Sequence, residues 1–366
     1  MLYEHFRNYG CRLNTDYSYK NLRIAVLEND LLRVSVLVDK GTDVFELLYK
    51  PKDIDFMWLS PWGIKTPASF VPTVSAREGN FMDYYEGGWQ EILPNFGYGG
   101  TFFGPVEEGL HGEICLIPWD LEVLENNSSK VSIKFMVRTY RTPFYLEKTM
   151  TLKKGDPKLY ISERLKNEGY ADINFMWTHH PTFGGEFLDE SILIDIPEDN
   201  EVKLVMKNKN GVFDYDAGKH ENKWPVFKGS SGHVTDFSRS PLLVNDNDNG
   251  MDEIGVRLKK DGWYAITNAN RKAGIGFKWD TGIFPYLWIW RTYGKTCTSA
   301  PWFGRVECMA IELCSSCSGN GLEGAIKNKT SLCLGPQQEI FTEFFTIAYE
   351  GSQRIKNIDK DGDISY

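Results

Sequence analysis

The stretch Lys130-Val-Ser-Ile-Lys-Phe-Met-Val-Arg138 shows the fold class of this chain most clearly. Its apolar residues Val131, Ile133, Phe135 and Val137 recur at every second position, with mostly polar residues between them. Successive side chains of a β-strand point to opposite faces, so this period of two predicts a strand with one buried face.

The same alternation recurs in segments 31–38, 144–152, 158–166, 192–196, 254–258 and 341–349. The 34 glycines and 16 prolines are scattered between these segments as turn residues. Long segments with a helical period are missing, and we expect at most short helices, one of them near 81–91. Many short strands in a chain of 366 residues predict an all-β protein, a large antiparallel sandwich or barrel. We expect one domain over 1–366, ending in a polar tail at 351–366.

Composition and charge exclude several classes of protein. Hydrophobic residues make up 42% and charged residues 25%, which is typical of a globular chain and not of a disordered one. The net charge of −9 argues against nucleic acid and anionic membranes as partners, because both attract basic surfaces. The segment Met1–Cys11 lacks the basic and apolar pattern of a signal peptide, and seven cysteines suit reduced thiols. We therefore expect a cytoplasmic protein.

Motifs for nucleotide, hydride, serine-hydrolase and zinc-protease chemistry are absent. The chain has no GxxxxGK[ST], GxSxG or HExxH sequence, and its GxGxxG match at Gly319–Gly324 lies outside any βαβ pattern, which the dinucleotide fingerprint requires. Cys314-Ser-Ser-Cys317 has the spacing of half a zinc site, but no second close pair of ligands accompanies it. We expect neither a cofactor nor a metal ion.

Five segments combine turn residues with side chains able to carry chemistry. They are 87–95, 109–119, 177–184, 280–291 and 309–314. Glu312 interrupts an apolar strand, so it either points to solvent or is partly desolvated for a purpose. Histidine exchanges protons near neutral pH, and His111, His179 and His180 all lie in turn contexts. Tryptophan next to such residues is typical of a sugar pocket, because an indole packs on the C–H face of a sugar ring. It is equally typical of the hydrophobic core of a β-sandwich.

At these segments the chain resembles the aldose 1-epimerase (galactose mutarotase-like) superfamily, and within it a bacterial branch. The similarity begins at Leu27–Gly41 and ends with Glu312 and the closing segment Leu334–Phe341. Between them lie the matching motifs Leu110-His-Gly112, His180-Pro-Thr-Phe183 and Phe284-Pro-Tyr-Leu-Trp-Ile-Trp290. The resemblance implies an antiparallel β-supersandwich with a sugar cleft on one sheet.

Position by position, the resemblance implies that His180 is the general acid and Glu312 the general base. His111 matches the sugar-binding histidine of the His-Gly motif, and Asp280 is similar in place to a carboxylate that binds ring hydroxyls. Arg77 is the candidate for the arginine of the galactose mutarotase Asn-Arg signature, which is otherwise missing. The substrate-binding residues that we expect are His111, Asp280, Gln90, Trp89, His179, Trp290 and Arg291.

The chemistry expected from these residues is interconversion of the α and β anomers of a free aldose by ring opening and closure. In these roles His180 must be protonated to start, so we expect activity to be lost above its pKa. Three alternatives remain: a hexose-6-phosphate 1-epimerase with Arg291 or Arg305 at the phosphate, a noncatalytic sugar-binding protein, and a lyase or hydrolase using Glu312 with Asp280. In each case the partner is a small sugar, and the protein is a monomer or homodimer.

Overall fold

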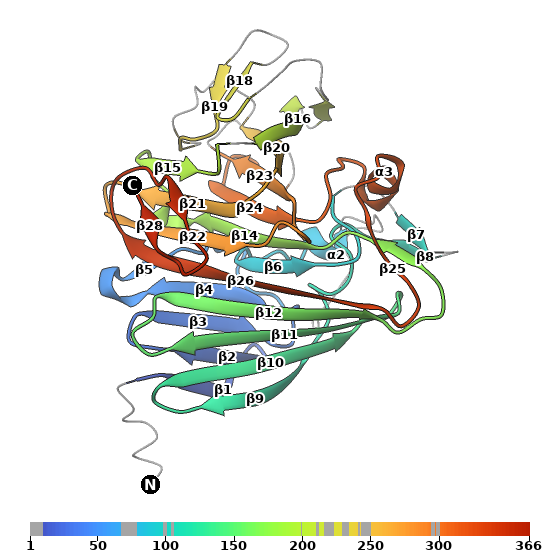
Figure 1. The fold of residues 1–366 in the computed structure, drawn as a ribbon, viewed down its shortest axis with the longest axis horizontal. Coiled ribbons are helices and arrows are strands. Elements are labelled where there is room, and N and C mark those ends of the chain that lie inside the picture. Colours follow the sequence, from blue (N-terminus) through green and yellow to red (C-terminus); the bar gives the residue numbers. More distant parts are fainter. Residues whose placement is uncertain are drawn as a thin grey trace.

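Two large antiparallel β-sheets face each other in the computed structural model of the protein (Figure 1). The structure describes residues 10–66, 79–97, 101–103, 106–198, 200–209, 212–215, 223–228, 234–240, 242, 250–293, 297 and 301–366. The predicted all-β sandwich is confirmed.

The first sheet has twelve strands, in the order β1-β2-β3-β4-β6-β14-β24-β23-β20-β16-β17, with β5 paired to β4. Its strands are β1 (Arg12–Tyr19), β2 (Leu22–Glu28), β3 (Leu32–Leu37), β4 (Asp43–Tyr49), β5 (Ile54–Asp55), β6 (Trp89–Ile92), β14 (Thr178–Gly184), β16 (Asn200–Lys209), β17 (Val212–Tyr215), β20 (Met251–Leu258), β23 (Tyr286–Thr292) and β24 (Cys308–Cys314). Segments far apart in the sequence are therefore neighbours at its centre.

The second sheet has eight strands, in the order β15-β21-β22-β26-β12-β11-β10-β9. They are β9 (Asp120–Asn126), β10 (Lys130–Arg138), β11 (Phe144–Lys153), β12 (Lys158–Asn167), β15 (Ile192–Asp195), β21 (Gly262–Asn268), β22 (Ala273–Trp279) and β26 (Glu339–Glu350). The predicted inward face of β10 is confirmed: Val131, Ile133, Phe135 and Val137 are buried in one core with residues of the first sheet, such as Val34.

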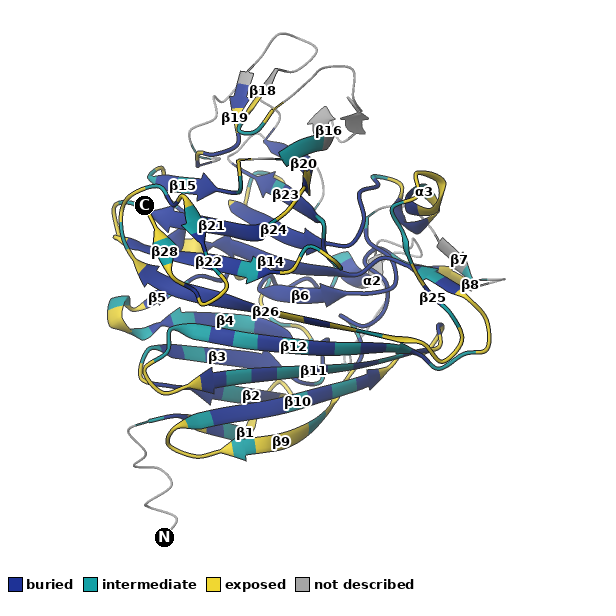
Figure 2. Cartoon of the chain, viewed as in Figure 1, coloured by how far each residue is buried: buried dark blue, intermediate teal, exposed yellow. Residues whose placement is uncertain are grey.

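Burial differs between the two sheets in a way that locates the site. Strand β12 alternates buried and half-buried residues, as a strand with one solvated face does, whereas every residue of β14 and β24 is buried (Figure 2). Other parts of the chain therefore cover the outer face of the first sheet at its centre. The residues that point outward there lie beneath this cover and not in open solvent.

The remaining elements are small. They are α2 (Gly79–Met82), α3 (Gly321–Lys327), the 3-10 turns η1 (Lys50–Lys52) and η3 (Gly185–Phe187), and the two-stranded pairs β7 (Thr101–Phe103) with β8 (Val106–Glu108), β13 (Ile173–Phe175) with β25 (Leu332–Leu334), β18 (Val226–Lys228) with β19 (Val234–Asp236) and β27 (Asn357–Ile358) with β28 (Ile364–Ser365). The helix expected near 81–91 is limited to α2, and β6 begins at Trp89. The segment predicted as a polar tail forms the β27–β28 hairpin, with Ile355 and Ile358 buried. None of the helices in the described ranges is long and apolar enough to span a membrane.

Candidate active site

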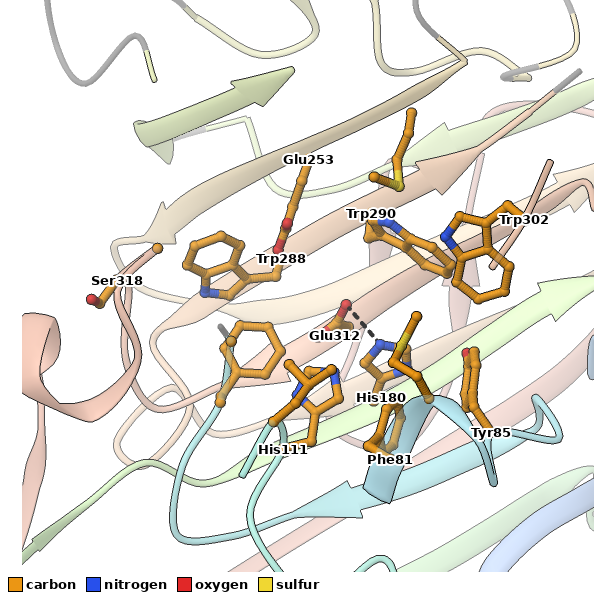
Figure 3. Close-up of a pocket in the computed structure, with 16 residues that line it drawn as sticks. Phe81, Tyr85, His111, His180, Glu253, Trp288, Trp290, Trp302, Glu312 and Ser318 are labelled. Atoms are coloured by element: carbon orange, nitrogen blue, oxygen red, sulfur yellow. Dashed lines mark ion pairs between the residues drawn. The ribbon is translucent and has the colours of Figure 1, made fainter. Parts of the chain in front are cut away.

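A pocket lies on the covered outer face of the first sheet, over β14, β24, β23 and β20 (Figure 3). Its empty space is about 640 Å³ when the part open to solvent is included. It is lined by Phe81, Met82, Tyr85, Phe96, Gly97, Leu110, His111, His180, Met251, Glu253, Trp288, Trp290, Trp302, Glu312, Ser318 and Gly319. Four of the predicted site residues, His111, His180, Trp290 and Glu312, meet in it.

His180 and Glu312 face each other at the floor of this pocket. Strands β14 and β24 pair so that Thr178 lies opposite Cys314 and Thr182 opposite Ala310, which places His180 across from Glu312. Nε2 of His180 lies 3.4 Å from Oε1 of Glu312, and both side chains are buried. The alternation of β24 correctly places Glu312 on the face opposite Ile311, but that face is covered here.

The protonation states of this pair follow from its burial. Burial lowers the pKa of His180 to about 4, because the charged imidazolium loses its hydration. Burial, reinforced by the nearby Glu253 carboxyl, raises the pKa of Glu312 well above its usual range. Both shifts favour the uncharged forms, a carboxylic acid beside a neutral imidazole.

His111 reaches the pocket from a strained turn. Its φ of 63° is unusual for a residue with a side chain, and Gly112 follows it in the same left-handed region with a φ of 70°. The His111 ring stacks on Phe96 at 5.3 Å and lies 5.4 Å from the ring of His180. Its Nδ1 is buried without a hydrogen-bond partner in the described part of the chain.

Two further features suit a polar ligand with apolar faces. Oε2 of Glu312, like Nδ1 of His111, is buried and unpartnered among the described residues. Buried polar atoms are normally satisfied, so two orphaned atoms in one pocket indicate places where a ligand forms hydrogen bonds. Trp290, tilted over His180 at 6.2 Å between ring centroids, supplies an indole surface beside them.

Glu253 is a pocket residue that the sequence analysis missed. It lies on β20 opposite Trp290, so both point into the pocket. Burial and the adjacent Asp252 carboxylate raise the pKa of Glu253 to about 8. The register with Trp290 is the signal that identifies it, and that register is visible only in the folded sheet.

His179 and Trp89 lie on the other side of the sheet, between the two layers. Neighbouring residues of a strand face opposite ways, so His179 points inward where His180 points outward. The Nε1 of Trp89 donates a hydrogen bond to Nδ1 of His179 at 3.3 Å, and Nε2 of His179 lies 3.1 Å from Glu163 on the opposite sheet. The expectation that His179 and Trp89 line the sugar pocket has no geometric support.

This inward cluster resembles a metal site in composition but not in charge. Ligand atoms of Glu91, Glu163 and His179 lie within 4.8 Å of one another. The ammonium of Lys148 lies 2.8 Å from Oε2 of Glu91, however, and already compensates one carboxylate. With a divalent cation added to this buried space, the two carboxylates of Glu91 and Glu163 would have to neutralise both the Lys148 ammonium and the ion, and their negative charge is too small for that. We therefore regard the cluster as a polar link between the sheets.

Arg291 and Asp280 also lie away from the pocket lining. Arg291 follows Trp290 and so faces inward, where it is fully buried and forms two hydrogen bonds of 2.7 and 2.6 Å to Asp252. Asp280 is exposed just after β22 of the second sheet, and its Oδ1 accepts a hydrogen bond from the Gly282 amide. Neither of these two expected substrate-binding residues lines the pocket.

Gln90 occupies an intermediate position. It pairs with His180 across β6 and β14 and points to the same face. Its amide donates to the Gly87 carbonyl and lies 3.5 Å from Oδ2 of Asp43, which in turn binds the buried Lys40 ammonium at 2.8 Å. Gln90 therefore borders the site without lining it. Arg77, the remaining candidate, lies outside the described residues.

Comparison with solved structures confirms the predicted galactose mutarotase-like fold. A candidate aldose 1-epimerase from Klebsiella pneumoniae superposes with a TM-score of 0.69 at 14% identity, over 93% of this chain and 84% of the other. A galactose mutarotase related enzyme from Lactobacillus acidophilus gives 0.59 at 16% identity, over 90% and 98%. A galactose mutarotase-like protein from Clostridium acetobutylicum gives 0.60 at 12% identity, over 93% and 99%.

Identities this low establish a shared fold and not a shared substrate. No functionally curated protein matches the sequence. Residues 20–300 match a family model described as a domain of unknown function, DUF4432, and the chain therefore belongs to the DUF4432 family.

Proposed function

We propose that this protein is an aldose 1-epimerase that interconverts the α and β anomers of a free sugar. The observation that carries this proposal is the His180–Glu312 pair, 3.4 Å apart on the floor of an aromatic pocket. Anomer exchange needs one group that takes a proton and one that gives a proton, and this pair supplies both without a cofactor.

The reaction begins from the uncharged pair. Nε2 of His180 takes the proton of the anomeric hydroxyl while Glu312 gives its proton to the ring oxygen. The C1–O5 bond breaks as the C1=O1 double bond forms, leaving His180 as imidazolium and Glu312 as carboxylate. Rotation about C1–C2 then presents the other face of the carbonyl to O5.

Ring closure reverses both proton transfers and restores the pair. Glu312 takes the proton of the O5 hydroxyl, and His180 gives a proton to O1. The resemblance implied the opposite starting roles, with Glu312 as base and His180 as acid, and in our proposal those roles apply during closure. Burial decides the starting state, because it disfavours the charged form of each group.

The lining of the pocket supports a free sugar over a sugar phosphate. Among the described residues that line it, none is lysine or arginine, whereas Glu253 and Glu312 are both acidic. Of the two arginines considered for a phosphate, Arg291 is paired with Asp252 on the inner face. The guanidinium of Arg305 lies over the Trp62 ring at 5.2 Å, outside the lining.

Saturation-transfer NMR on a panel of free and 6-phosphorylated aldoses tests the proposal. Wild-type protein should transfer saturation between the two anomeric protons of at least one free aldose. His180→Asn and Glu312→Gln should each lower kcat by a factor of about 10² to 10⁴, which is the rate enhancement that a positioned acid or base usually contributes. Asp280→Asn is the matched control, because this carboxylate is exposed and lies on the other sheet.

Each outcome selects one function. Exchange that is lost in both pocket variants and kept in the control supports the epimerase. Folded protein that accelerates no sugar, but shows ligand-dependent shifts of its own signals, supports a sugar-binding protein instead. Release of a reducing sugar from a glycoside would overturn the proposal in favour of a hydrolase using Glu253 and Glu312.

A further inference from the structure

A short hydrogen-bond chain runs from the edge of the pocket to the back of the His180 ring. The hydroxyl of Tyr85 lies 2.6 Å from Oγ1 of Thr182, and this Oγ1 lies 3.2 Å from Nδ1 of His180. Thr182 follows His180 by two residues on β14 and so points to the same face of the sheet. All three side chains are buried.

The chain fixes which ring nitrogen faces the pocket. With Nδ1 directed at Thr182, Nε2 is left facing Glu312. A histidine ring held by only one nitrogen can flip about its χ2 bond, which exchanges Nδ1 with Cδ2 and Nε2 with Cε1 and turns both nitrogens away from these partners. The hydrogen bond between Nδ1 and Oγ1 of Thr182 disfavours this flip, as partners of the second ring nitrogen generally do.

The surroundings of the two ring nitrogens also indicate where the single proton of a neutral ring resides. Nε2 lies 3.4 Å from Oε1 of Glu312, and burial favours the protonated form of that carboxyl. A carboxylic acid beside Nε2 can donate its hydrogen only if Nε2 is unprotonated, so the proton of a neutral ring is then on Nδ1.

The hydroxyl groups can accommodate a proton on Nδ1. Oγ1 of Thr182 can accept a hydrogen bond from Nδ1 and donate its own hydrogen to the oxygen of Tyr85, because either hydroxyl can be the donor in that contact. Tyr85 lines the pocket, so its hydrogen can bond to a water molecule or to a sugar hydroxyl there. Every hydrogen of the chain then has an acceptor.

We propose that Thr182, oriented by Tyr85, is a positioning residue that holds the proton of neutral His180 on Nδ1 and leaves Nε2 free to accept a proton beside Glu312. The contribution of this residue to turnover rests on the proposed epimerase function. The position of the ring proton does not rest on that function, because it can be measured on the free protein.

The test combines a spectroscopic and a kinetic measurement on three variants. Thr182→Val removes the hydroxyl and keeps the shape of the side chain, Thr182→Ser keeps the hydroxyl, and Tyr85→Phe removes the outer member of the chain. Nitrogen-15 NMR of histidine-labelled protein near pH 7 reports the protonated nitrogen, and the His180→Asn spectrum identifies the signals of His180.

The expected wild-type spectrum has a protonated Nδ1 and an unprotonated Nε2 on His180. Thr182→Val should shift the population toward protonated Nε2 and lower kcat about 10- to 100-fold with KM changed less than about threefold. Thr182→Ser should restore both readouts, and Tyr85→Phe should lower kcat by about three- to tenfold. A purely structural role for Thr182 would leave the ring tautomer unchanged.

The outcomes separate this proposal from the proposed function. A wild-type ring protonated on Nε2, or an unchanged His180 spectrum in Thr182→Val, overturns the positioning role even if anomer exchange is fast. Absence of anomer exchange together with a protonated Nδ1 overturns the epimerase and leaves the tautomer assignment standing.

Discussion

Acidification from pH 7.5 to pH 5.5 should leave the enzymatic anomer exchange almost unchanged. In our mechanism His180 must be neutral to take the first proton, so activity is lost as the pH falls through the pKa of His180. Burial lowers that pKa to about 4. Glu312 must carry a proton, so activity is also lost as the pH rises through the pKa of Glu312, which burial raises.

The size of the effect follows from these values. At pH 5.5 a histidine with a pKa of about 4 is about 97% neutral, whereas one with the ordinary value of about 6.5 is only about 9% neutral. A buried and an ordinary His180 therefore differ about tenfold in the active fraction at this pH. That difference is well above the error of a rate measurement.

The assay is kcat/KM for anomer exchange by saturation-transfer NMR, which reports the pKa values of the free enzyme. Spontaneous exchange is measured without protein at each pH and subtracted, and far-UV circular dichroism confirms that the protein stays folded. Asp280→Asn should give the same profile as the wild type.

Two results would refute this reasoning. A tenfold fall of kcat/KM at pH 5.5 would mean that the pKa of His180 is not lowered by burial. A rise on acidification, with activity lost above pH 6.5, would mean that imidazolium is the starting acid, as the resemblance implied.

Three further predictions concern residues around the pocket. Arg291→Ala should lower the free energy of unfolding in urea by about 3–5 kcal/mol, because Asp252 is left buried and unpaired. The control Arg271→Ala breaks an exposed ion pair with Glu186 and should lower the same free energy by less than about 1 kcal/mol. Equal losses of stability in the two variants would contradict the structural role of Arg291. The kcat/KM for anomer exchange of glucose 6-phosphate should be at least about 100-fold lower than that of the best free aldose, because the phosphate has no cationic partner in the described lining. Comparable kcat/KM values would contradict the preference for a free sugar. Trp290→Ala should raise KM about tenfold in the same NMR assay, because it removes the indole over the site. Trp290→Phe should restore most of the affinity. An unchanged KM in Trp290→Ala would show that this indole does not contact the sugar.

Local patterns in the sequence predicted the strands well. The period of two over 130–138 identified β10 and its buried face, because alternation in one strand is a local property. The resemblance also identified His180, Glu312 and His111, which the structure brings into one pocket. The roles of these residues remain predictions until the variants are measured.

Expected and observed positions differ where the face of a strand or the pairing between strands decides which residues line the pocket. A shift of one residue moves a side chain to the opposite side of the sheet, so His179 and Arg291 face inward beside His180 and Trp290. Asp280 shares a Pro-turn segment with Trp290 but lies just after β22 of the other sheet. Glu253 was missed because only its pairing with Trp290 brings it into the pocket.

By itself the sequence determined the all-β class, the strands and the residue types able to carry acid–base chemistry, because each depends on neighbours within a few positions. Only the tertiary structure decided which of these residues meet. His180 and Glu312 are distant in the chain, and their encounter depends on the register between β14 and β24. The cover over the outer face of the sheet then sets their charge, because desolvation depends on everything packed around a group and not on its own segment.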